Sequence, residues 1–438
     1  MPLPAPDATV GEGSGPFSSF AGRRRGDAPR GTTRIAALCE ELGRPQDALD
    51  TIHVVGTDGK TSVTRMVSAI LTALGIRTGD TTSPHLSQVG ERIRIDGVEL
   101  DDATLVLLAK HVGHAIERVE PALDHPVTFF EAITSGALRA FVDAGVEVAV
   151  VEAGIGGRGD ATAIVDARTC VLTPVGLDHP QLGATRRDVT HEKASVVRRG
   201  GTLVVAPQAL EVLDAVRDVA RARGVQVFVA GDDFGVVDRR IVDRGQVVTL
   251  WGLDGCNLEV HLEVRGAHQA ANAAVALATV QAHLGFDRVD LHAVAAGLAR
   301  VRVPGRGEVI QTAQGPVLLD GAHDAVAARA LRALLDEGRC VGRVAVVIGT
   351  SAGRNPVELA RRFAGADVGF VATAAEEPGA TPAREIASSL SRAGLPVIGE
   401  VSWFDAVDVA RRWCGPQARI LVTGSLHLVG AVRSALVR

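Results

Sequence analysis

The stretch Ile52-His53-Val54-Val55-Gly56-Thr57-Asp58-Gly59-Lys60-Thr61-Ser62 decides the fold class of this chain. Its first four residues form a short buried strand in our interpretation, and the Gly residues that follow mark a tight turn. Beyond the turn, apolar residues recur at helical spacing from Val63 to Leu74, and Gly75 closes the pattern. A strand, a Gly-rich turn and a helix in this order open a nucleotide-binding α/β unit.

The turn itself has the chemistry of a phosphate-binding loop. Gly56 and Gly59 let the backbone N–H groups of Thr57 and Asp58 wrap a phosphate, and the helix N-terminus adds partial positive charge. Lys60 can reach the β- and γ-phosphates of ATP, and the hydroxyl of Thr61 or Ser62 can bind Mg²⁺. The longer P-loop pattern has Gly where this chain has Val54, so we interpret the turn as a shortened P-loop. The alternative is a structural turn without a ligand.

The rest of the chain continues the alternation of strands and helices. Strands are predicted at 146–151, 169–172, 203–205 and 225–229. Two further β-like runs, at 241–251 and 258–264, suggest a small antiparallel sheet. After a break at 302–306, strands are predicted at 317–319, 344–348, 369–372, 396–398 and 420–422. We predict an α/β protein with a P-loop nucleotide-binding parallel-sheet domain followed by a smaller Rossmann-like α/β domain. The predicted bounds are 1–31 for a flexible tail, 32–301 for the ATP-binding domain and 302–438 for the C-terminal domain.

Composition narrows the function classes. The chain has 438 residues, with 46 Lys and Arg against 51 Asp and Glu, so its net charge is −5. This balance argues against nucleic-acid binding by a basic surface. No apolar run approaches the roughly 20 residues needed to span a bilayer, and the N-terminus lacks the apolar core of a secretory signal. Five Cys without a CxxC pair argue against a disulfide scaffold or a zinc site, so we expect a cytoplasmic protein.

Lysine is rare enough to be informative. Only Lys60, Lys110 and Lys193 occur among the 46 basic residues, and Tyr is absent, which indicates a coding bias in which Arg fills ordinary surface positions. A Lys that persists under such a bias is expected to be needed for its chemistry, because a guanidinium does not replace a compact ammonium.

Two further motifs follow predicted strands of the first domain. Glu152 ends an apolar strand and opens a Gly-rich turn that runs to Asp160, so it is placed to ligate a metal, the alternative being a solvated strand end. Asp178 and His179 follow the strand at 169–172, and Lys193 comes after them. A buried Lys near a metal has either a depressed pKa or a covalent modification to an anion, and the residues alone leave both open.

The second half of the chain adds nucleotide and phosphate candidates. Gln269 and Asn272 are three residues apart on one helix face, where their amides could bind a purine edge or simply lie at the helix surface. Arg306 could clamp a phosphate. The run Asp320 to Asp324, which contains His323, follows a strand, and Thr423-Gly424-Ser425 follows the last strand.

Together these motifs resemble the folylpolyglutamate synthase and dihydrofolate synthase family of the Mur ligase superfamily, from about residue 33 to the end. The matching pieces are 42–46, 53–60, 82–86, 91–93, 128–131, 152–160, 178–179, 182–183, 192–194, 304–306, 320–323 and 423–426. The resemblance implies an enzyme that uses ATP to convert a substrate carboxylate into an acyl phosphate, which the amino group of an amino acid, glutamate in the family, then attacks.

The resemblance also implies roles for individual residues. Lys60 would contact the phosphates, Thr61 or Ser62 with Glu152 would bind one Mg²⁺, and His179 with a carbamylated Lys193 would bind a second. Gln269 and Asn272 would face the base, and Arg306, Asp320 and His323 would bring the second domain onto ATP. The predicted catalytic residues are Lys60, Lys193 and His323, and the residues assigned to the acid and amino-acid substrates are Ser83, His85, Asp160, Asp324 and Ser425.

Several motif positions depart from the family pattern. Asp58 and Asp324 stand where the family has Asn, Thr61 where it has Gly, Ala163 where it has Asn, and His427 where it has Tyr. We interpret this pattern as an intact ATP-binding site with altered binding sites for the acid and the amino acid. Folate-type glutamyl ligation is therefore the leading hypothesis. Its alternatives are the same mechanism on another acid and amine, a degenerate nucleotide-binding protein without catalysis, and a P-loop kinase that forms no amide.

Overall fold

The computed structural model describes residues 15–20, 22–23, 29–177, 179–337, 342–415 and 419–437. The described chain divides into two compact units. The N-terminal unit comprises residues up to 263 together with 268–302, and the described residues of the C-terminal unit are 264–267 and 303–437. The division in the chain at 302–303 lies beside the predicted domain boundary.

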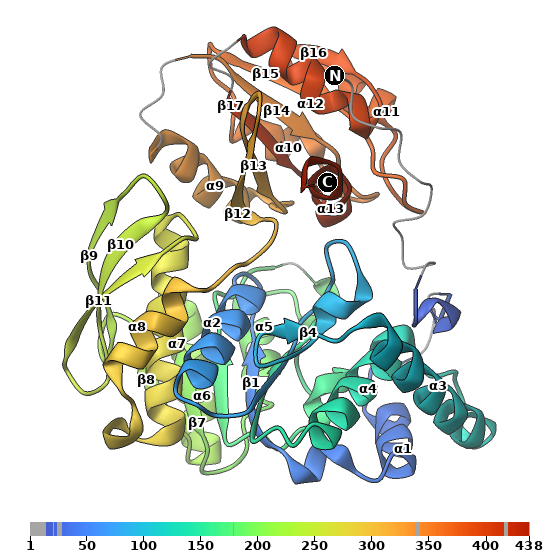
Figure 1. Cartoon of the computed structure of the whole chain (residues 1–438), viewed down its shortest axis with the longest axis vertical. Coiled ribbons are helices and arrows are strands. Elements are labelled where there is room, and N and C mark those ends of the chain that lie inside the picture. The colour runs from blue at the N-terminus through green and yellow to red at the C-terminus, as the bar shows by residue number, and fades with distance from the viewer. Residues whose placement is uncertain are drawn as a thin grey trace. The chain divides into compact units, whose positions relative to one another are not determined.

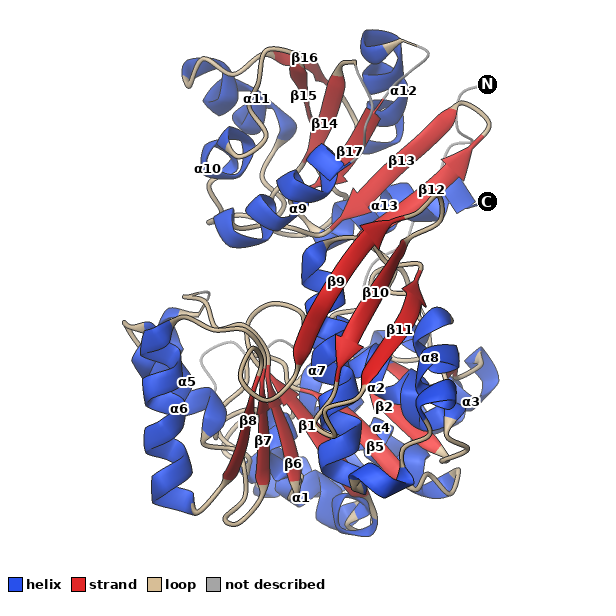
Figure 2. Ribbon diagram, turned by 90° about the vertical axis from the view of Figure 1, so that its left-hand side faces the viewer, coloured by secondary structure: helices blue, strands red, loops and turns tan. Residues whose placement is uncertain are grey.

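An eight-stranded sheet forms the centre of the N-terminal unit (Figures 1 and 2). Its strands are β1 (Asp50–Val55), β2 (Thr78–Thr81), β3 (Ile93–Ile95), β4 (Val98–Glu99), β5 (Val148–Glu152), β6 (Thr169–Leu172), β7 (Thr202–Val205) and β8 (Gln226–Val229). The order is β4-β3-β2-β5-β1-β6-β7-β8, with all pairs parallel except β2–β3 and β3–β4. β1 lies between β5 and β6, so the P-loop turn leaves the sheet centre beside the ends of both neighbours.

Helices cover both faces of this sheet, as its near-continuous apolar strands require. They are α1 (Thr33–Glu41), α2 (Lys60–Ala73), α3 (Asp102–Val119), α4 (Phe129–Asp143), α5 (Arg186–Ala194), α6 (Leu210–Arg223), α7 (Ala267–Leu284) and α8 (Leu291–Ala299). One core joins alternate strand residues such as Val55, Val151 and Leu172 to α1 and α3–α6. On the other face α2 packs on β1, β2 and β5 and against α8.

The predicted small antiparallel sheet is present as a separate three-stranded sheet of β9 (Gly235–Ile241), β10 (Gln246–Trp251) and β11 (Asn257–Leu262). The β-like run predicted at 241–251 covers the last residue of β9, a turn at 242–245 and all of β10, and the rest of β9 was not predicted. Gly245 has φ +91° in this turn, and a Cβ there would lie 1.9 Å from the Leu262 carbonyl oxygen.

The C-terminal unit is a six-stranded sheet of Rossmann-like construction. Its elements are β12 (Arg306–Thr312), β13 (Gly315–Asp320), α9 (Ala325–Glu337), β14 (Val344–Ile348), α10 (Pro356–Arg361), β15 (Val368–Ala372), α11 (Ala383–Arg392), β16 (Val397–Glu400), α12 (Trp403–Cys414), β17 (Arg419–Thr423) and α13 (Leu426–Val437). The order is β12-β13-β17-β14-β15-β16, and only the β12–β13 pair is antiparallel.

The N-terminal residues differ from the predicted flexible tail where the structure describes them. Phe17 and Phe20 are 0% and 5% exposed, and they pack against helices α3 and α4. The backbone N–H of Phe129 donates to the Arg23 carbonyl oxygen at 2.8 Å, and Arg23 forms an ion pair with Glu120. Two buried aromatic rings therefore fix this stretch on the domain. The rest of the predicted tail up to residue 28, which includes Arg24 and Arg25, lies outside the described residues.

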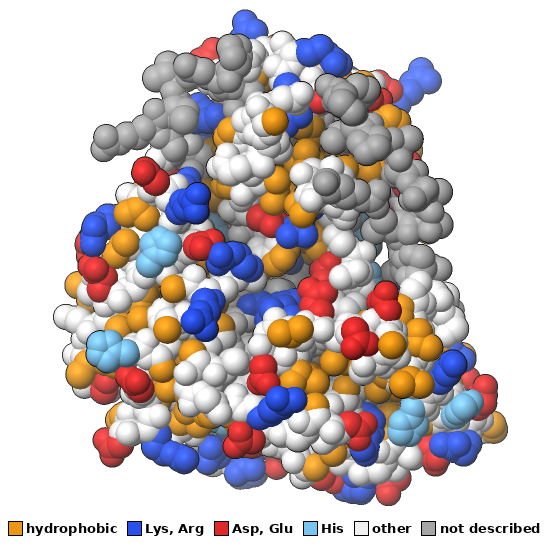
Figure 3. Space-filling view, in the orientation of Figure 1, with side chains coloured by type: hydrophobic (Ala, Val, Ile, Leu, Met, Phe, Trp, Pro, Cys, Tyr) orange, Lys and Arg blue, Asp and Glu red, His pale blue; other side chains and the backbone are white. Residues whose placement is uncertain are grey.

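Two observations concern the membrane and nucleic-acid partners against which the composition argued. No helix in the described part of the chain combines the length and apolarity needed to cross a bilayer. On the face drawn in Figure 3, basic and acidic side chains are interspersed with apolar ones.

Candidate functional site

Two glycines give the turn after β1 its shape. Gly56 has φ +142°, and a Cβ on it would lie 2.0 Å from Thr173 Oγ1. Gly59, the residue before α2, has φ +83°, and a Cβ on it would lie 2.9 Å from Asn272 Oδ1. Both positions need glycine because of the positive φ and the close approach of neighbours.

The loop between these glycines is fixed at the N-terminus of α2. The N–H groups of Thr57 and Asp58 donate to the Pro174 carbonyl oxygen at 2.9 and 3.3 Å. Lys60 Nζ donates to the carbonyl oxygen of Thr57 at 3.0 Å, so the ammonium lies over the turn. A cation and a helix N-terminus on one turn favour phosphate binding. The N–H groups of Thr57 and Asp58, which were predicted to wrap a phosphate, donate to Pro174 here, so phosphate binding by this turn stays a prediction.

Thr61 and Glu152 bring the first two motifs together. The Thr61 hydroxyl lies 3.0 Å from both carboxylate oxygens of Glu152, a residue only 3% exposed at the end of β5. Ser62 points elsewhere, because its hydroxyl accepts a hydrogen bond from Gln269 Nε2 at 3.2 Å. Of the two hydroxyls left open by the sequence, the geometry favours Thr61 as the partner of Glu152.

Gln269 and Asn272 lie on α7 against the start of α2. Asn272 Nδ2 donates to Gln269 Oε1 at 3.1 Å, and both side chains are buried. Part of their hydrogen bonding therefore supports the P-loop and each other, and contact with a purine base stays a prediction.

Lys193 joins the P-loop to the Gly-rich turn after β5. Its side chain lies at the end of α5 with no exposed surface, and Nζ donates to the carbonyl oxygens of Gly56 at 2.7 Å and Ile155 at 2.8 Å. The unmodified ammonium thus satisfies one carbonyl from each loop. A carbamate keeps a single N–H, so a carbamylated Lys193 would retain at most one of these bonds.

A buried chain of hydrogen bonds holds the Gly-rich turn. Asp160 accepts from the N–H groups of Ile155 and Gly156 at 2.9 and 2.8 Å and from the Thr162 hydroxyl at 2.6 Å. Because that hydroxyl donates to Asp160, its oxygen is left to accept from His53 Nε2, 2.8 Å away. His53 on β1 is therefore the neutral tautomer with the proton on Nε2.

Burial lowers the pKa of His53 from 6.5 to about 4, although the Asp160 carboxylate nearby acts in the opposite direction. As the pH falls below 6.5, His53 takes up a proton in the unfolded chain, whereas in the folded chain it takes one up only near pH 4. We expect this residue to cost about 2 kcal/mol of unfolding free energy between pH 7.5 and 5. Urea unfolding at both pH values should show a larger loss for the wild type than for His53→Gln, which keeps an N–H donor. An equal loss in both proteins would contradict this assignment.

Two of the residues assigned to the acid and amino-acid substrates, Ser83 and His85, lie in the loop after β2. The Ser83 N–H donates to Glu152 Oε2 at 3.1 Å, so this loop reaches the end of β5. His85 Nδ1 accepts from Arg92 Nε at 2.8 Å. Glu91 fixes the loop by accepting from three consecutive N–H groups, those of 86–88.

In the C-terminal unit Asp320 organises the turn after β13. Its carboxylate accepts from the N–H groups of Gly307 at 2.7 Å and Ala322 at 2.8 Å, beside Arg306 at the start of β12. His323 Nδ1 lies 3.1 Å from the Gly321 carbonyl oxygen, which can only accept, so Nδ1 carries the proton. Burial lowers the pKa of His323, and this bond to Gly321 partly opposes that effect.

Asp324 caps the helix that follows. Its Oδ1 accepts from the N–H groups of Val326 at 2.9 Å and Ala327 at 2.8 Å at the start of α9. Asn and Asp cap helices about equally well, so replacing the family's Asn by Asp preserves this task.

We therefore expect Asp324→Asn to change the free energy of unfolding little, and Asp324→Ala to lower it by about 1 kcal/mol. Urea unfolding of the three proteins measures both effects. Equal stability of the Ala and Asn variants would contradict the capping role. A separate effect of Asp324 on the amino-acid substrate stays a prediction.

Comparison with known proteins identifies the family to which this chain belongs. Residues 54–280 match the Mur ligase middle domain, and residues 305–426 match the Mur ligase, glutamate ligase domain. The chain belongs to the Mur ligase family. The two matched regions cover the P-loop, Lys193, Gln269 and the turn at Asp320.

Curated relatives of this Mur ligase are folate enzymes. It is 41% identical over 325 residues to the dihydrofolate synthase/folylpolyglutamate synthase of Mycobacterium tuberculosis, which covers 68% of this chain and 65% of that protein. The chain thus spans less than two thirds of this relative's length in the match. It is 31% identical to the folylpolyglutamate synthase of Lacticaseibacillus casei, over 92% of this chain and 94% of that protein.

The fold agrees with these relatives. A crystal structure of M. tuberculosis folylpolyglutamate synthase complexed with ADP and AMPPCP has a TM-score of 0.86 and 33% identity, over 93% of this chain and 96% of that one. The predicted fold class is confirmed. This Mur ligase has the architecture of folylpolyglutamate synthases.

The predicted second metal site would use His179 and Lys193. Among the residues described, no group of three or more His, Cys, Asp or Glu side chains gathers as a metal site. His179 precedes a short 3-10 helix at Pro180–Leu182, and Asp178 lies outside the described residues. A second Mg²⁺ bound by His179 and Lys193 stays a prediction.

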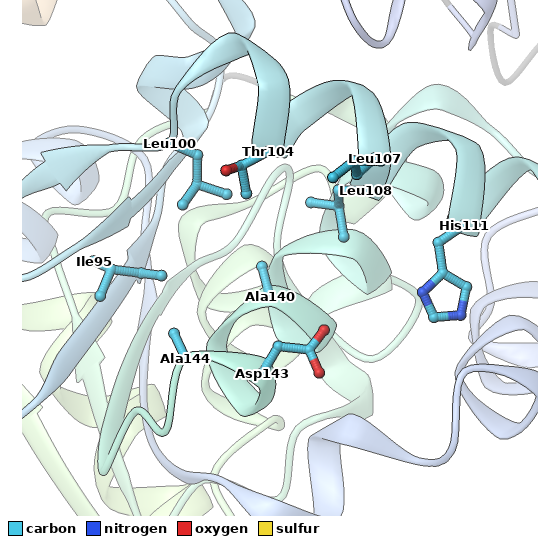
Figure 4. Close-up of a pocket in the computed structure, with 9 residues that line it drawn as sticks. All are labelled: Ile95, Leu100, Thr104, Leu107, Leu108, His111, Ala140, Asp143 and Ala144. Atoms are coloured by element: carbon cyan, nitrogen blue, oxygen red, sulfur yellow. The ribbon is translucent and has the colours of Figure 1, made fainter.

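A separate pocket of about 340 Å³ lies between β3, α3 and α4 (Figure 4). It is lined by Ile95, Leu100, Thr104, Leu107, Leu108, His111, Ala140, Asp143 and Ala144. None of these is a candidate site residue, so the pocket does not belong to the P-loop site.

The sequence analysis assigned no role to three residues that contact the motif loops, namely His53, Arg30 and Glu377. His53 is the one polar residue in the run Ile52–Val55, which was a usable signal. Arg30, whose guanidinium donates to the Gly156 carbonyl oxygen at 2.5 Å, and Glu377, which pairs with His427, carry no pattern that distinguishes them from surface charges.

Proposed function

We propose that this protein is an ATP-dependent amide ligase that joins a small-molecule carboxylic acid to an amino acid. The observation that carries the proposal is the meeting of the P-loop with the end of β5, where Thr61 faces the buried Glu152 beside Lys60. Membership of the Mur ligase family supports it, as does the likeness to a relative solved with ADP and AMPPCP.

The proposed reaction has two steps. A carboxylate oxygen of the acid attacks the γ-phosphorus of ATP, the bond to the β-phosphate oxygen breaks, and ADP leaves with the formation of an acyl phosphate. The amino nitrogen then attacks the acyl carbon, inorganic phosphate leaves, and the nitrogen loses a proton. Lys60 stabilises negative charge on the transferred phosphoryl group throughout the first step.

The residues around Glu152 fit Mg²⁺. A buried carboxylate and a hydroxyl are hard oxygen ligands, and Mg²⁺ is commonly held by one or two carboxylates together with substrate phosphates. Bound there, the ion would neutralise charge on the phosphates. Thr61 and Glu152 are the residues that would hold it, and Ser83, through its N–H, helps to orient the carboxylate.

We further propose that Lys193 contributes to the ATP site from its position between the two loops that it joins, at Gly56 and Ile155. The carbamylated form implied by the family resemblance would give up one of the two carbonyl contacts and offer anionic oxygens in its place. An unmodified Lys193 would act only by holding Gly56 and Ile155 together. Dependence of activity on dissolved CO₂ distinguishes these two roles.

Folate-type glutamyl ligation is the first substrate hypothesis, because the curated relatives carry those names. A different acid and amine are favoured by the altered motif residues Asp58, Ala163 and His427. The proposed location is the cytoplasm, which the free thiols of Cys39, Cys170, Cys256 and Cys414 support.

The test is phosphate release in the presence of ATP, Mg²⁺, a panel of acids and a panel of amino acids. The proposal expects release that requires both an acid and an amine. Phosphate release that needs neither would favour a nucleotide hydrolase. Phosphate found on the acid without any amide would favour a kinase, and no turnover would favour a degenerate nucleotide-binding protein.

A further inference from the structure

The loop 82–91, which follows β2, is held at its base by Arg65 from helix α2. Arg65 Nη2 donates to the Glu91 carbonyl oxygen at 2.8 Å and to the Thr82 hydroxyl at 3.3 Å, so one guanidinium bonds to both ends of the loop. The Thr82 N–H also donates to the Arg92 carbonyl oxygen at 3.1 Å. The guanidinium therefore closes the loop at the point where its two ends meet.

A buried ion-pair network fixes the position of Arg65. Its side chain is only 8% exposed, and Nη1 lies 3.9 Å from Oδ1 of the fully buried Asp80 on β2. Asp80 also accepts from the Ser68 hydroxyl on α2 at 2.8 Å and pairs with Arg94 on β3 at 2.8 Å. A planar guanidinium held in this way presents its remaining N–H groups in fixed directions.

The same loop contacts the proposed magnesium ligand. The Ser83 N–H donates to Glu152 Oε2 at 3.1 Å, and the Thr61 hydroxyl lies 3.0 Å from both oxygens of that carboxylate. Thr61 and Arg65 are four residues apart on α2, so they lie on one face of the helix. Helix α2 thus acts on Glu152 twice, directly through Thr61 and indirectly through the loop 82–91.

We propose that Arg65 is a positioning residue for magnesium binding, because it holds the loop 82–91 closed and so allows Ser83 to orient the Glu152 carboxylate. The role rests on the proposed ligase function, in which Glu152 and Thr61 hold Mg²⁺. Groups that orient a metal-ligating side chain commonly change metal affinity about 10- to 100-fold when they are removed.

Hydrogen exchange tests the closed loop without reference to activity. The carboxylate of Glu91 accepts from the N–H groups of 86–88, so exchange of these three hydrogens reports opening of the loop. Arg65→Met keeps an apolar stem and loses every donor. These hydrogens should exchange about tenfold faster in it, the scale expected for losing a hydrogen bond from a charged donor. Arg65→Lys keeps the charge and should lie between the wild type and Arg65→Met.

The second measurement is the free Mg²⁺ concentration that gives half-maximal phosphate release at saturating ATP, acid and amine. Arg65→Met should raise it about tenfold, with kcat at saturating Mg²⁺ little changed. Arg94→Met is the matched control, because the Arg94 side chain bonds to the same buried Asp80 and to the Gly97 carbonyl oxygen rather than to the loop 82–91. It should lower the thermal unfolding temperature and keep the wild-type Mg²⁺ requirement.

Unchanged exchange at 86–88 in Arg65→Met overturns the proposal. So does an Arg94→Met variant whose Mg²⁺ requirement rises as much as that of Arg65→Met, because the effect would then come from the buried ion pair. Where Arg65→Met does not fold, wild-type exchange and Mg²⁺ requirement in Arg65→Lys overturn it equally. The ligase function is judged separately, by whether phosphate release requires both an acid and an amine, and hydrogen exchange decides the role of Arg65 in the loop whatever that result.

Discussion

Lys60→Ala is expected to lower turnover at least about 100-fold, the usual scale for removing one preorganised charge that stabilises a transition state. Lys60 Nζ lies over the turn at Thr57, where the transferred phosphoryl group is proposed to bind. The side chain is only partly buried, so its removal should leave the fold intact. Steady-state phosphate release measures the loss.

Thermal unfolding is the control for Lys60→Ala, because a correctly folded but inactive variant is the expected result. Lys110 provides a matched variant, since it is exposed on α3 and outside every motif. Lys110→Ala should keep full turnover. Near-normal turnover of Lys60→Ala would refute the P-loop assignment.

Lys193→Arg is expected to be as inactive as Lys193→Ala. The Lys193 side chain has no exposed surface and spans the carbonyl oxygens of Gly56 and Ile155, so a larger planar guanidinium does not fit the same position. A guanidinium also cannot carry a carbamate. Turnover measured with and without added bicarbonate, alongside the intact mass of the wild type, separates the carbamylated from the unmodified form.

A folded Lys193→Arg enzyme with substantial turnover would contradict both roles proposed for this residue. Because either substitution disturbs a buried position, thermal unfolding and ADP binding should be measured in parallel. Loss of turnover with ADP binding retained is the pattern that the proposed site predicts.

The apolar strands were predictable because burial on both faces leaves a clear signal. β6 and β14 begin and end where the sequence predicted, at Thr169–Leu172 and Val344–Ile348. β2 was missed because its sequence, Thr78–Thr81, is polar. Asp80 is fully buried there, where the Ser68 hydroxyl donates to it at 2.8 Å and Arg94 on β3 pairs with it at 2.8 Å. These partners are distant in sequence and give no local pattern.

The same distinction holds in the site. Lys60 and Glu152 were identified because they flank the Gly-rich turns that follow predicted strands, and Lys193 was identified because Lys is rare in this chain. The choice of Thr61 over Ser62 depends on Gln269, more than 200 positions along the chain, and could not come from the motif. The cap formed by Asp324 could have been foreseen, because Asp directly before a helix is a common N-cap.

The central claim is that ATP cleavage drives formation of an amide. Mass spectrometry of reactions containing ATP, Mg²⁺ and pools of candidate acids and amino acids tests it most directly. The account predicts a product with the mass of acid plus amino acid less one water, formed with equal amounts of ADP and phosphate. ATP consumption that yields a phosphorylated acid, or ADP and phosphate with no amide, would contradict it.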